Sequence, residues 1–229
     1  MHSIKPKVSY TNFLIHLIPY IIFLCGIIYY ASDAYSLLAF PLDDAWIHRV
    51  YSKSFAFGKG FQYNTGIQEA GSTSPLWAIV SSPSHWLESL GTNAVVITVK
   101  LLGVILGLLT INLIYKISKS FTNSQFVGII SASLFALEPR FLFSTLSGME
   151  TSLLLTLWLG ALTAFISRRN ILALFLFSLT PVTRPEALIT IPLALFGLLL
   201  ITQPKKKIFQ TVLSLVNTYN TNVIMDYLL

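Results

Sequence analysis

Two adjacent acids, Asp43 and Asp44, follow the first long apolar stretch of the chain and open a polar segment. Acidic side chains at the edge of a bilayer are costly unless they are solvated or take part in chemistry. A carboxylate in this place can act as a general base that accepts a proton from an attacking hydroxyl group. The structural alternative is that Asp43 caps a helix and that Asp44 interacts with the positive end of its dipole. His48 lies four residues after Asp44, on the same face of the expected helix.

Two later motifs combine an acid with the expected start of a helix. Ser147–Glu150 and Thr183–Glu186 both fit the capping box, in which Ser or Thr precedes Glu by three positions. Capping alone would account for both hydroxyl residues and both glutamates, but not for Arg184. A guanidinium group beside helix N-termini is suited to hold a phosphate by two contacts. Arg49 and Arg140 are weaker candidates for the same contact.

Aromatic and small residues complete the set of candidates. Trp77 and Tyr63 have rings that can stack on a sugar, although aromatic residues also collect at membrane interfaces for structural reasons. Gly103 and Gly107 form a Gly-x-x-x-Gly step, which is typical of close helix contacts. The single cysteine, Cys25, excludes a disulfide within the chain. The sequence contains no metal-binding motif, no phosphate-binding glycine loop and no Ser-His-Asp pattern.

The elements that must position these residues are membrane helices. The chain has 229 residues, of which 54% are hydrophobic and 10% charged, and its mean hydropathy is +0.71. Soluble domains carry about 25% charged residues. The net charge of +6 comes from short, separate basic clusters, which indicate membrane topology and not a nucleic-acid-binding face. We therefore predict an all-α, polytopic transmembrane helix bundle with an outer loop that bears short interfacial helices.

The apolar segments define the expected organisation. The first is longer than the roughly 7–15 apolar residues of a secretory signal, so we interpret it as a retained helix. A transmembrane module occupies residues 1–207, and residues 208–229 form a truncated or frayed tail. The outer loop covers residues 32–90. The last four spans are shorter than the ~20 residues that a bilayer requires, so they extend into their flanks or are shielded in a bundle. The spans lie near residues 13–30, 94–115, 125–137, 151–166, 171–182 and 187–202.

The basic residues decide the orientation of these spans. If residues 75–90 lie in the interface without crossing, nine of the 15 Lys and Arg residues fall on one side, mostly in short loops. The positive-inside rule then places this side and the N-terminus in the cytoplasm. The acid pair and the motifs around Ser74–Trp77, Glu150 and Arg184 consequently share the opposite, extracytoplasmic face of the plasma (inner) membrane.

Five short motifs occur in order along the chain: Leu42–Arg49, Gly58–Asn64, Gly71–Trp77, Ser147–Thr151 and Arg184–Glu186. In these motifs the sequence resembles the N-terminal part of GT-C glycosyltransferases, and most of all their arabinofuranosyltransferase-like and lipopolysaccharide-core-type branch. Family members usually have more spans than are expected here.

The resemblance implies an integral membrane enzyme whose site lies at the outer interface. Such enzymes move a sugar from a polyprenyl-phosphate carrier to a hydroxyl group of a glycan, lipid or protein acceptor, usually with inversion. One member of the pair Asp43 and Asp44 would be the base. The resemblance implies no particular cofactor and leaves the use of a divalent metal open. The residues expected to line the substrate site are His48, Arg49, Tyr63, Trp77, Glu150, Arg184 and Glu186.

Two alternatives remain at this point. The chain can be a catalytically inactive fragment of such an enzyme, which is compatible with every motif above. It can also be a small transporter or an assembly subunit, but a transporter would place acids near the middle of its spans. Since the acids here lie at span ends, the sequence favours the enzyme.

Overall fold

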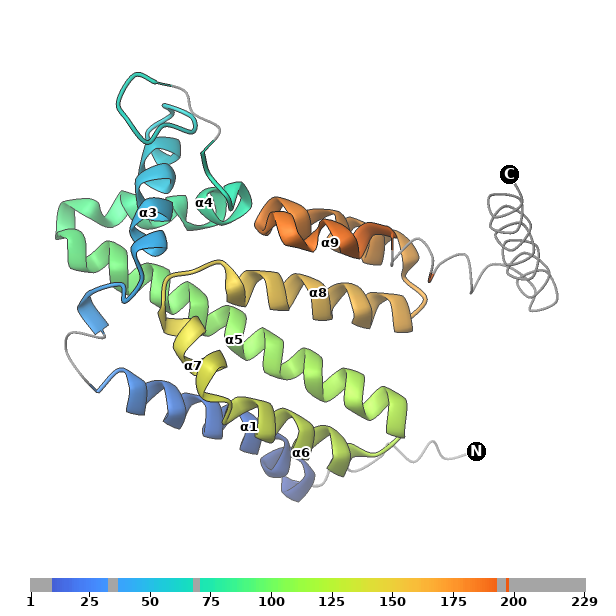
Figure 1. Cartoon of the computed structure of the whole chain (residues 1–229). Coiled ribbons are helices and arrows are strands. Elements are labelled where there is room, and N and C mark those ends of the chain that lie inside the picture. Colours follow the sequence, from blue (N-terminus) through green and yellow to red (C-terminus); the bar gives the residue numbers. More distant parts are fainter. Residues whose placement is uncertain (1–9, 33–36, 68–70, 193–196, 198–229) are drawn as a thin grey trace, which may run out of the picture. The chain divides into compact units, whose positions relative to one another are not determined.

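A computed structural model of the chain describes residues 10–32, 37–67, 71–192 and 197 (Figure 1). The described residues form helices and short 3-10 helices without any strand, which confirms the all-α prediction. A compact unit extends to Leu188, and all that follows concerns this unit. The helices are α1 (Tyr10–Tyr30), α3 (Asp43–Ala56), α4 (Pro75–Ser81), α5 (Thr92–Thr122), α6 (Gln125–Ala136), α7 (Pro139–Leu146), α8 (Thr151–Ile166) and α9 (Asn170–Thr183), with 3-10 helices η1 (Ser82–Leu90) and η2 (Pro185–Ile189).

Helices α1, α5, α6, α8 and α9 coincide with the first five predicted spans. Helix α5 is long and apolar enough to cross a membrane by itself, and α6 with α7 forms a second candidate if this pair, bent by 63°, is one broken span. The apolar helices α8 and α9 and the described part of α1 are shorter than a full crossing. The sixth predicted span and the tail from residue 208 lie largely outside the described residues.

Helix α5 is the centre of this unit, with α1, α6, α7, α8 and η1 packed around it (Figure 1). The Gly-x-x-x-Gly step allows this close approach. A Cβ atom on Gly103 would collide with the backbone carbonyl of Thr145, and one on Gly107 would collide with the ring of Phe23. The sequence prediction of close helix contacts at this step is therefore confirmed.

Two buried clusters divide the apolar interior. The first surrounds Phe23 and Phe141 and joins α1, α5, α6 and α7. The second surrounds Trp77 and Val96 and joins the segment before α3 with α3, α4, α5 and α8. The second cluster matters for function, because it fixes α3 and the start of α8 with respect to each other.

Candidate functional site

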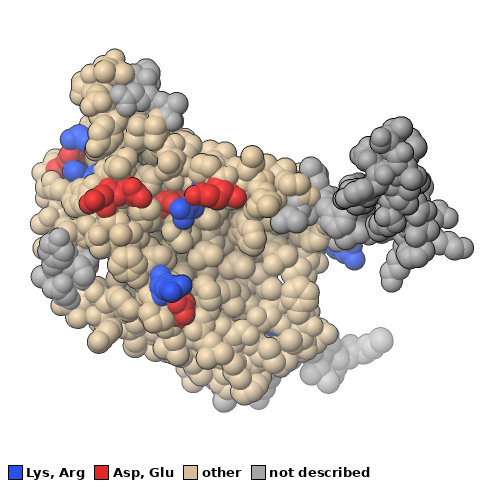
Figure 2. Space-filling model, in the orientation of Figure 1, with Lys and Arg blue, Asp and Glu red and all other residues tan. Residues whose placement is uncertain are grey.

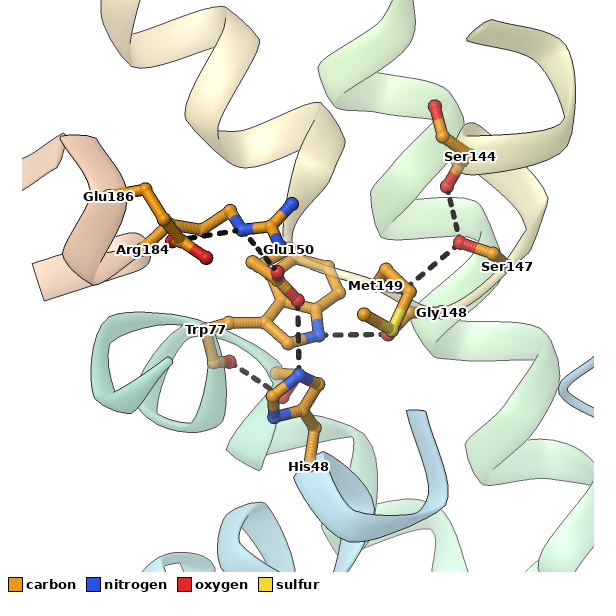
Figure 3. A network of polar contacts seen from close by, with 10 residues as sticks. His48, Trp77, Ser144, Ser147, Gly148, Met149, Glu150, Arg184 and Glu186 are labelled. Atoms are coloured by element: carbon orange, nitrogen blue, oxygen red, sulfur yellow. Dashed lines mark hydrogen bonds and ion pairs between the residues drawn. The ribbon is translucent and has the colours of Figure 1, made fainter. Parts of the chain in front are cut away.

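Four side chains from separate parts of the sequence meet at one point, which we call the Glu150 centre: His48, Glu150, Arg184 and Glu186 (Figure 3). His48 Nε2 lies 3.0 Å from Glu150 Oε2. Arg184 Nε lies 3.3 Å from Glu150 Oε1 and 3.6 Å from Glu186 Oε2. The structure thus brings together residues of α3, the start of α8 and the segment after α9, all of which the sequence had placed on one face.

The turn before α8 sets the position of Glu150. Gly148 has a φ of +79°, which favours glycine, and a Cβ atom there would collide with the ring of Phe40. The Gly148 carbonyl accepts a hydrogen bond of 2.9 Å from Trp77 Nε1. Within the same turn, Ser147 Oγ donates to the Ser144 carbonyl and accepts from the backbone N–H of Met149. The backbone is therefore held on both sides of the residue that precedes the acid.

The structure contradicts both capping boxes. Glu150 itself is the N-cap residue of α8, without a side-chain cap, and Ser147 belongs to the preceding turn. Thr183 ends α9, where its hydroxyl donates to the Leu179 carbonyl. The local pattern predicted the wrong role because a capping acid must turn back to its own helix. Glu150 instead points across to α3 and to Arg184 (Figure 3).

Burial makes the charge of Glu150 dependent on its neighbours. The side chains of His48 and Glu150 are 4% and 3% exposed. Burial raises the pKa of Glu150, but the contact with His48 and the charge of Arg184 outweigh it, so the pKa lies below its ordinary value. The carboxylate is thus charged at neutral pH. A buried ion without partners costs several kcal/mol, which these two neighbours offset.

The ring of His48 keeps one polar atom for another partner. A carboxylate that faces Nε2 favours a proton on this nitrogen, so Nδ1 is an acceptor in the neutral ring and a donor in the charged one. His48 Nδ1 is buried and has no hydrogen-bond partner among the described residues. Buried polar atoms are rarely left without a partner in folded proteins. The Glu150 centre therefore contains a buried polar atom on α3 that its described neighbours do not satisfy.

Asp43 and Asp44 are exposed in the first turn of α3. The expected cap is absent, because Leu42 is the N-cap residue and no side chain caps this helix. At 3.6 residues per turn, Asp44 lies about 40° from His48 around the helix axis, and Asp43 about 140°. Figure 2 shows acidic side chains in a row on this face with a basic side chain among them. Asp44 is thus the acid that shares a face with the Glu150 centre.

A buried lysine holds the chain immediately before these acids. Lys100 of α5 is 2% exposed and donates a hydrogen bond of 2.8 Å to the carbonyl of Ala39. Its ammonium group also lies 5.9 Å from the centroid of the Phe40 ring. Because Phe40 contacts Gly148 in turn, one network links α5, the start of α3 and the turn before α8.

Arg49 belongs to a different group, which we call the Glu88 cluster: Arg49, Ser52 and Lys53 of α3 with His85 and Glu88 of η1. Glu88 Oε1 lies 3.6 Å from Arg49 Nη2 and accepts a hydrogen bond of 2.7 Å from Lys53. His85 Nε2 lies 2.9 Å from Ser52 Oγ. The sequence analysis missed this cluster, although the spacing of His85 and Glu88 by three residues was a usable signal. The cluster attaches η1 to α3.

The two aromatic candidates lie elsewhere. Trp77 is 1% exposed, so it cannot stack on a sugar as predicted, and its function is to hold Gly148. Tyr63 is 47% exposed and lines a separate cavity of about 130 Å³ together with Val50 and Ser54. Val50 and Ser54 lie on the side of α3 that faces away from His48. The structure therefore does not bring Tyr63 to the Glu150 centre.

Comparison of the chain with protein-family models, with curated proteins and with solved structures gives no match. Within the described ranges, no three His, Cys, Asp or Glu side chains are arranged to hold a metal ion. The geometry of the site is consequently the basis of the functional argument.

Proposed function

We propose that the chain is a GT-C-type membrane glycosyltransferase that moves a sugar from a polyprenyl-phosphate carrier to an acceptor hydroxyl group, with inversion. The observation that carries this proposal is the Glu150 centre. Residues at positions 48, 150, 184 and 186 meet there, and Asp44 lies one helical turn from His48. A buried, charged carboxylate with a fixed guanidinium group and an exposed acid nearby is an arrangement suited to group transfer.

Asp44 is the proposed base. It shares a face with His48 and is exposed, so an acceptor hydroxyl can reach it. As the acceptor oxygen bonds to the anomeric carbon, its proton passes to the Asp44 carboxylate. The bond between the anomeric carbon and the phosphate oxygen breaks, and the electron pair leaves with the carrier phosphate. Asp43 is turned about 100° further around α3 and has no role in proton transfer.

Arg184 is the proposed contact for the leaving phosphate. Its Nε faces Glu150 and Glu186, which holds the guanidinium group beside the buried carboxylate. Its terminal nitrogens form no ion pair within the described part of the chain, and its side chain is 40% exposed. Donors fixed in advance stabilise the negative charge that develops on the departing oxygen. Glu150 and His48 act as positioning residues in this mechanism.

The outward apolar side chains support a multi-pass placement in the plasma (inner) membrane. Large apolar side chains remain exposed along α1, α5 and α9, and exposed apolar surface of this kind is typical of sites that contact a membrane or another protein. With the basic clusters in the cytoplasm, the N-terminus is cytoplasmic and the Glu150 centre is extracytoplasmic. The exposed apolar side chains on α1, α5 and α9 include Leu14, Ile21, Ile28, Leu101, Ile105, Leu109, Leu172 and Phe175.

The test is a transfer assay with the purified full chain in detergent. It uses a panel of radiolabelled polyprenyl-phosphate sugars and a membrane-extract acceptor. Asp44→Asn should lower the transfer rate by about 10²–10⁴-fold, the usual contribution of general base catalysis. Asp43→Asn is the matched control: it removes the same charge one residue away, on a different side of α3, so the rate should stay close to that of the wild type.

Two results would reject parts of this proposal. Full activity of Asp44→Asn would exclude Asp44 as the base. If folded wild-type protein transfers no sugar from any donor, the chain is an inactive fragment or an assembly subunit instead.

A further inference from the structure

A cavity of about 260 Å³ lies between α1 and α5, away from the Glu150 centre. Its walls are polar for helices of such apolar composition. Tyr20 Oη donates a hydrogen bond of 3.1 Å to Asn112 Oδ1, and the ring of His16 meets the ring of Tyr115 edge-on, at 5.2 Å between centroids. The remaining lining residues are Pro19 and Ile111.

Donors and acceptors remain available around this cavity. The hydrogen bond to Tyr20 uses the oxygen of Asn112, so its amide nitrogen keeps two N–H groups. Pro19 lies inside α1 and has no N–H, so the carbonyl of Ile15 lacks its helical donor. Unpaired polar groups between apolar helices are costly, so this cavity is a candidate binding site.

Positive charge lies next to the cavity. Lys119 Nζ is 5.8 Å from the centroid of Tyr115, a lining ring, and Lys116 is exposed one residue after that ring. Among the described residues, neither lysine forms an ion pair. The cavity therefore complements an anionic ligand.

The position along α5 corresponds to the depth of lipid headgroups. Lys100 and Lys116 are about 24 Å apart along the axis, at 1.5 Å rise per residue. The hydrocarbon core is about 30 Å thick, so the segment from Lys100 to Lys119, about 28 Å long at the same rise, comes close to its thickness. Tyrosine together with lysine is the composition found where helices meet headgroups. Under the proposed orientation, Tyr115 and Lys116 lie at the cytoplasmic edge.

We propose that this cavity binds the phosphate headgroup of an anionic phospholipid of the cytoplasmic leaflet. The phosphate contacts Lys119 and the Asn112 amide, and the acyl chains run along the exposed apolar side of α1, which includes Leu14 and Ile18. The inference rests on the membrane placement under the proposed function, but not on the transferase activity.

Native mass spectrometry of the full chain in mild detergent tests this site, with phosphatidylglycerol and phosphatidylcholine as probes. Phosphatidylglycerol should be retained at least about fivefold better, since each lysine near an anionic headgroup contributes about that factor. Lys119→Gln should remove this preference, and Asn112→Leu should weaken phosphatidylglycerol binding. Lys53→Gln, which removes a cation from α3, is the matched control and should leave it unchanged.

Three outcomes would overturn the proposal. The first is that the wild type retains the two lipids equally. The second is that Lys119→Gln binds phosphatidylglycerol as well as the wild type does. The third is that Lys53→Gln loses as much phosphatidylglycerol binding as Lys119→Gln, which would mean general charge attraction. Lys119 lies near the helix end, so its substitution is compatible with folding even if Asn112→Leu is not. The readout is lipid binding, so a failure of the transfer assay leaves this result intact.

Discussion

Helix α3 contributes to two groups of similar composition, the Glu150 centre and the Glu88 cluster, and their environments differ. Each contains a histidine, an arginine and a glutamate in close contact. The Glu150 side chain is 3% exposed, whereas that of Glu88 is 25% exposed. Exposed ion pairs contribute about 0–1 kcal/mol to stability, but loss of one partner of a buried pair costs about 3–5 kcal/mol. Similar residues therefore attach a surface helix in one place and hold a charged site in the other.

The two groups also differ in how far apart their members lie in the sequence. The Glu88 cluster joins α3 to η1, which follows it closely in the chain, whereas the Glu150 centre joins α3 to residues about a hundred and more positions later. Long-range contacts between charged groups are expensive to assemble, because loop closure and desolvation both oppose them. The Glu150 centre is therefore the more costly of the two groups to assemble.

The largest expected effect comes from removal of the cation beside Glu150. Arg184→Gln should lower the free energy of unfolding by up to about 3 kcal/mol, because the buried carboxylate keeps only His48 as a partner. Lys53→Gln removes one of the two cations beside Glu88 and should cost less than about 1 kcal/mol, because water screens this pair and Arg49 remains. Chemical denaturation of both variants in the same detergent measures the difference. Equal losses would mean that the two groups do not differ in the way that burial suggests.

A smaller effect is expected from Trp77→Phe. This change keeps most of the buried ring but removes the N–H that bonds to the Gly148 carbonyl. An unsatisfied buried carbonyl costs about 1–3 kcal/mol. The transfer rate should fall because Glu150 follows Gly148 in the turn, whereas substrate affinity should change little. Ser52→Ala is the control in the Glu88 cluster, and it should lower stability without a change in the transfer rate. If Trp77→Phe leaves the rate unchanged, Trp77 does not position Glu150.

The smallest effect concerns pH. Burial lowers the pKa of His85, and Arg49 and Lys53 act in the same direction, while Glu88 opposes them. The neutral ring is thus favoured in the folded state, so its contribution is present above the ordinary pKa of about 6.5 and is lost as pH falls below it. The hydrogen bond from Lys53 lowers the pKa of Glu88, so the contribution of Glu88 disappears only in more acidic solution, below about pH 4.5.

Thermal unfolding at pH 7.5 and pH 5.5 measures the His85 contribution. The wild type should lose stability at the lower pH, and His85→Gln should lose less, since it has no proton to gain. The same pH dependence in both proteins would assign the effect to another group.

The sequence predicted the helices well because their apolar runs are long: α8 has the expected range, whereas α5 continues seven residues past the expected end at position 115. It did not predict α7, whose eight residues include Arg140 and begin with Pro139. Counting the expected spans predicted that positions 48, 150 and 184 lie on the same face of the membrane. The direct partner of His48 did not follow, since Asp44 was the nearer acid in sequence and Glu150 became its partner only through tertiary contacts.

Trp77 has one more consequence. The chain has four tryptophans, and Trp77 is 1% exposed whereas Trp86 is 72% exposed and Trp158 43%. The indole of Trp77 bonds to the turn that carries Glu150, so its fluorescence depends on the state of that turn. A buried indole emits at shorter wavelength than an exposed one, so Trp77 contributes to the blue part of the emission spectrum. A ligand at the Glu150 centre would change the surroundings of this indole and therefore this part of the emission. The molecule thus contains its own optical reporter beside the candidate site.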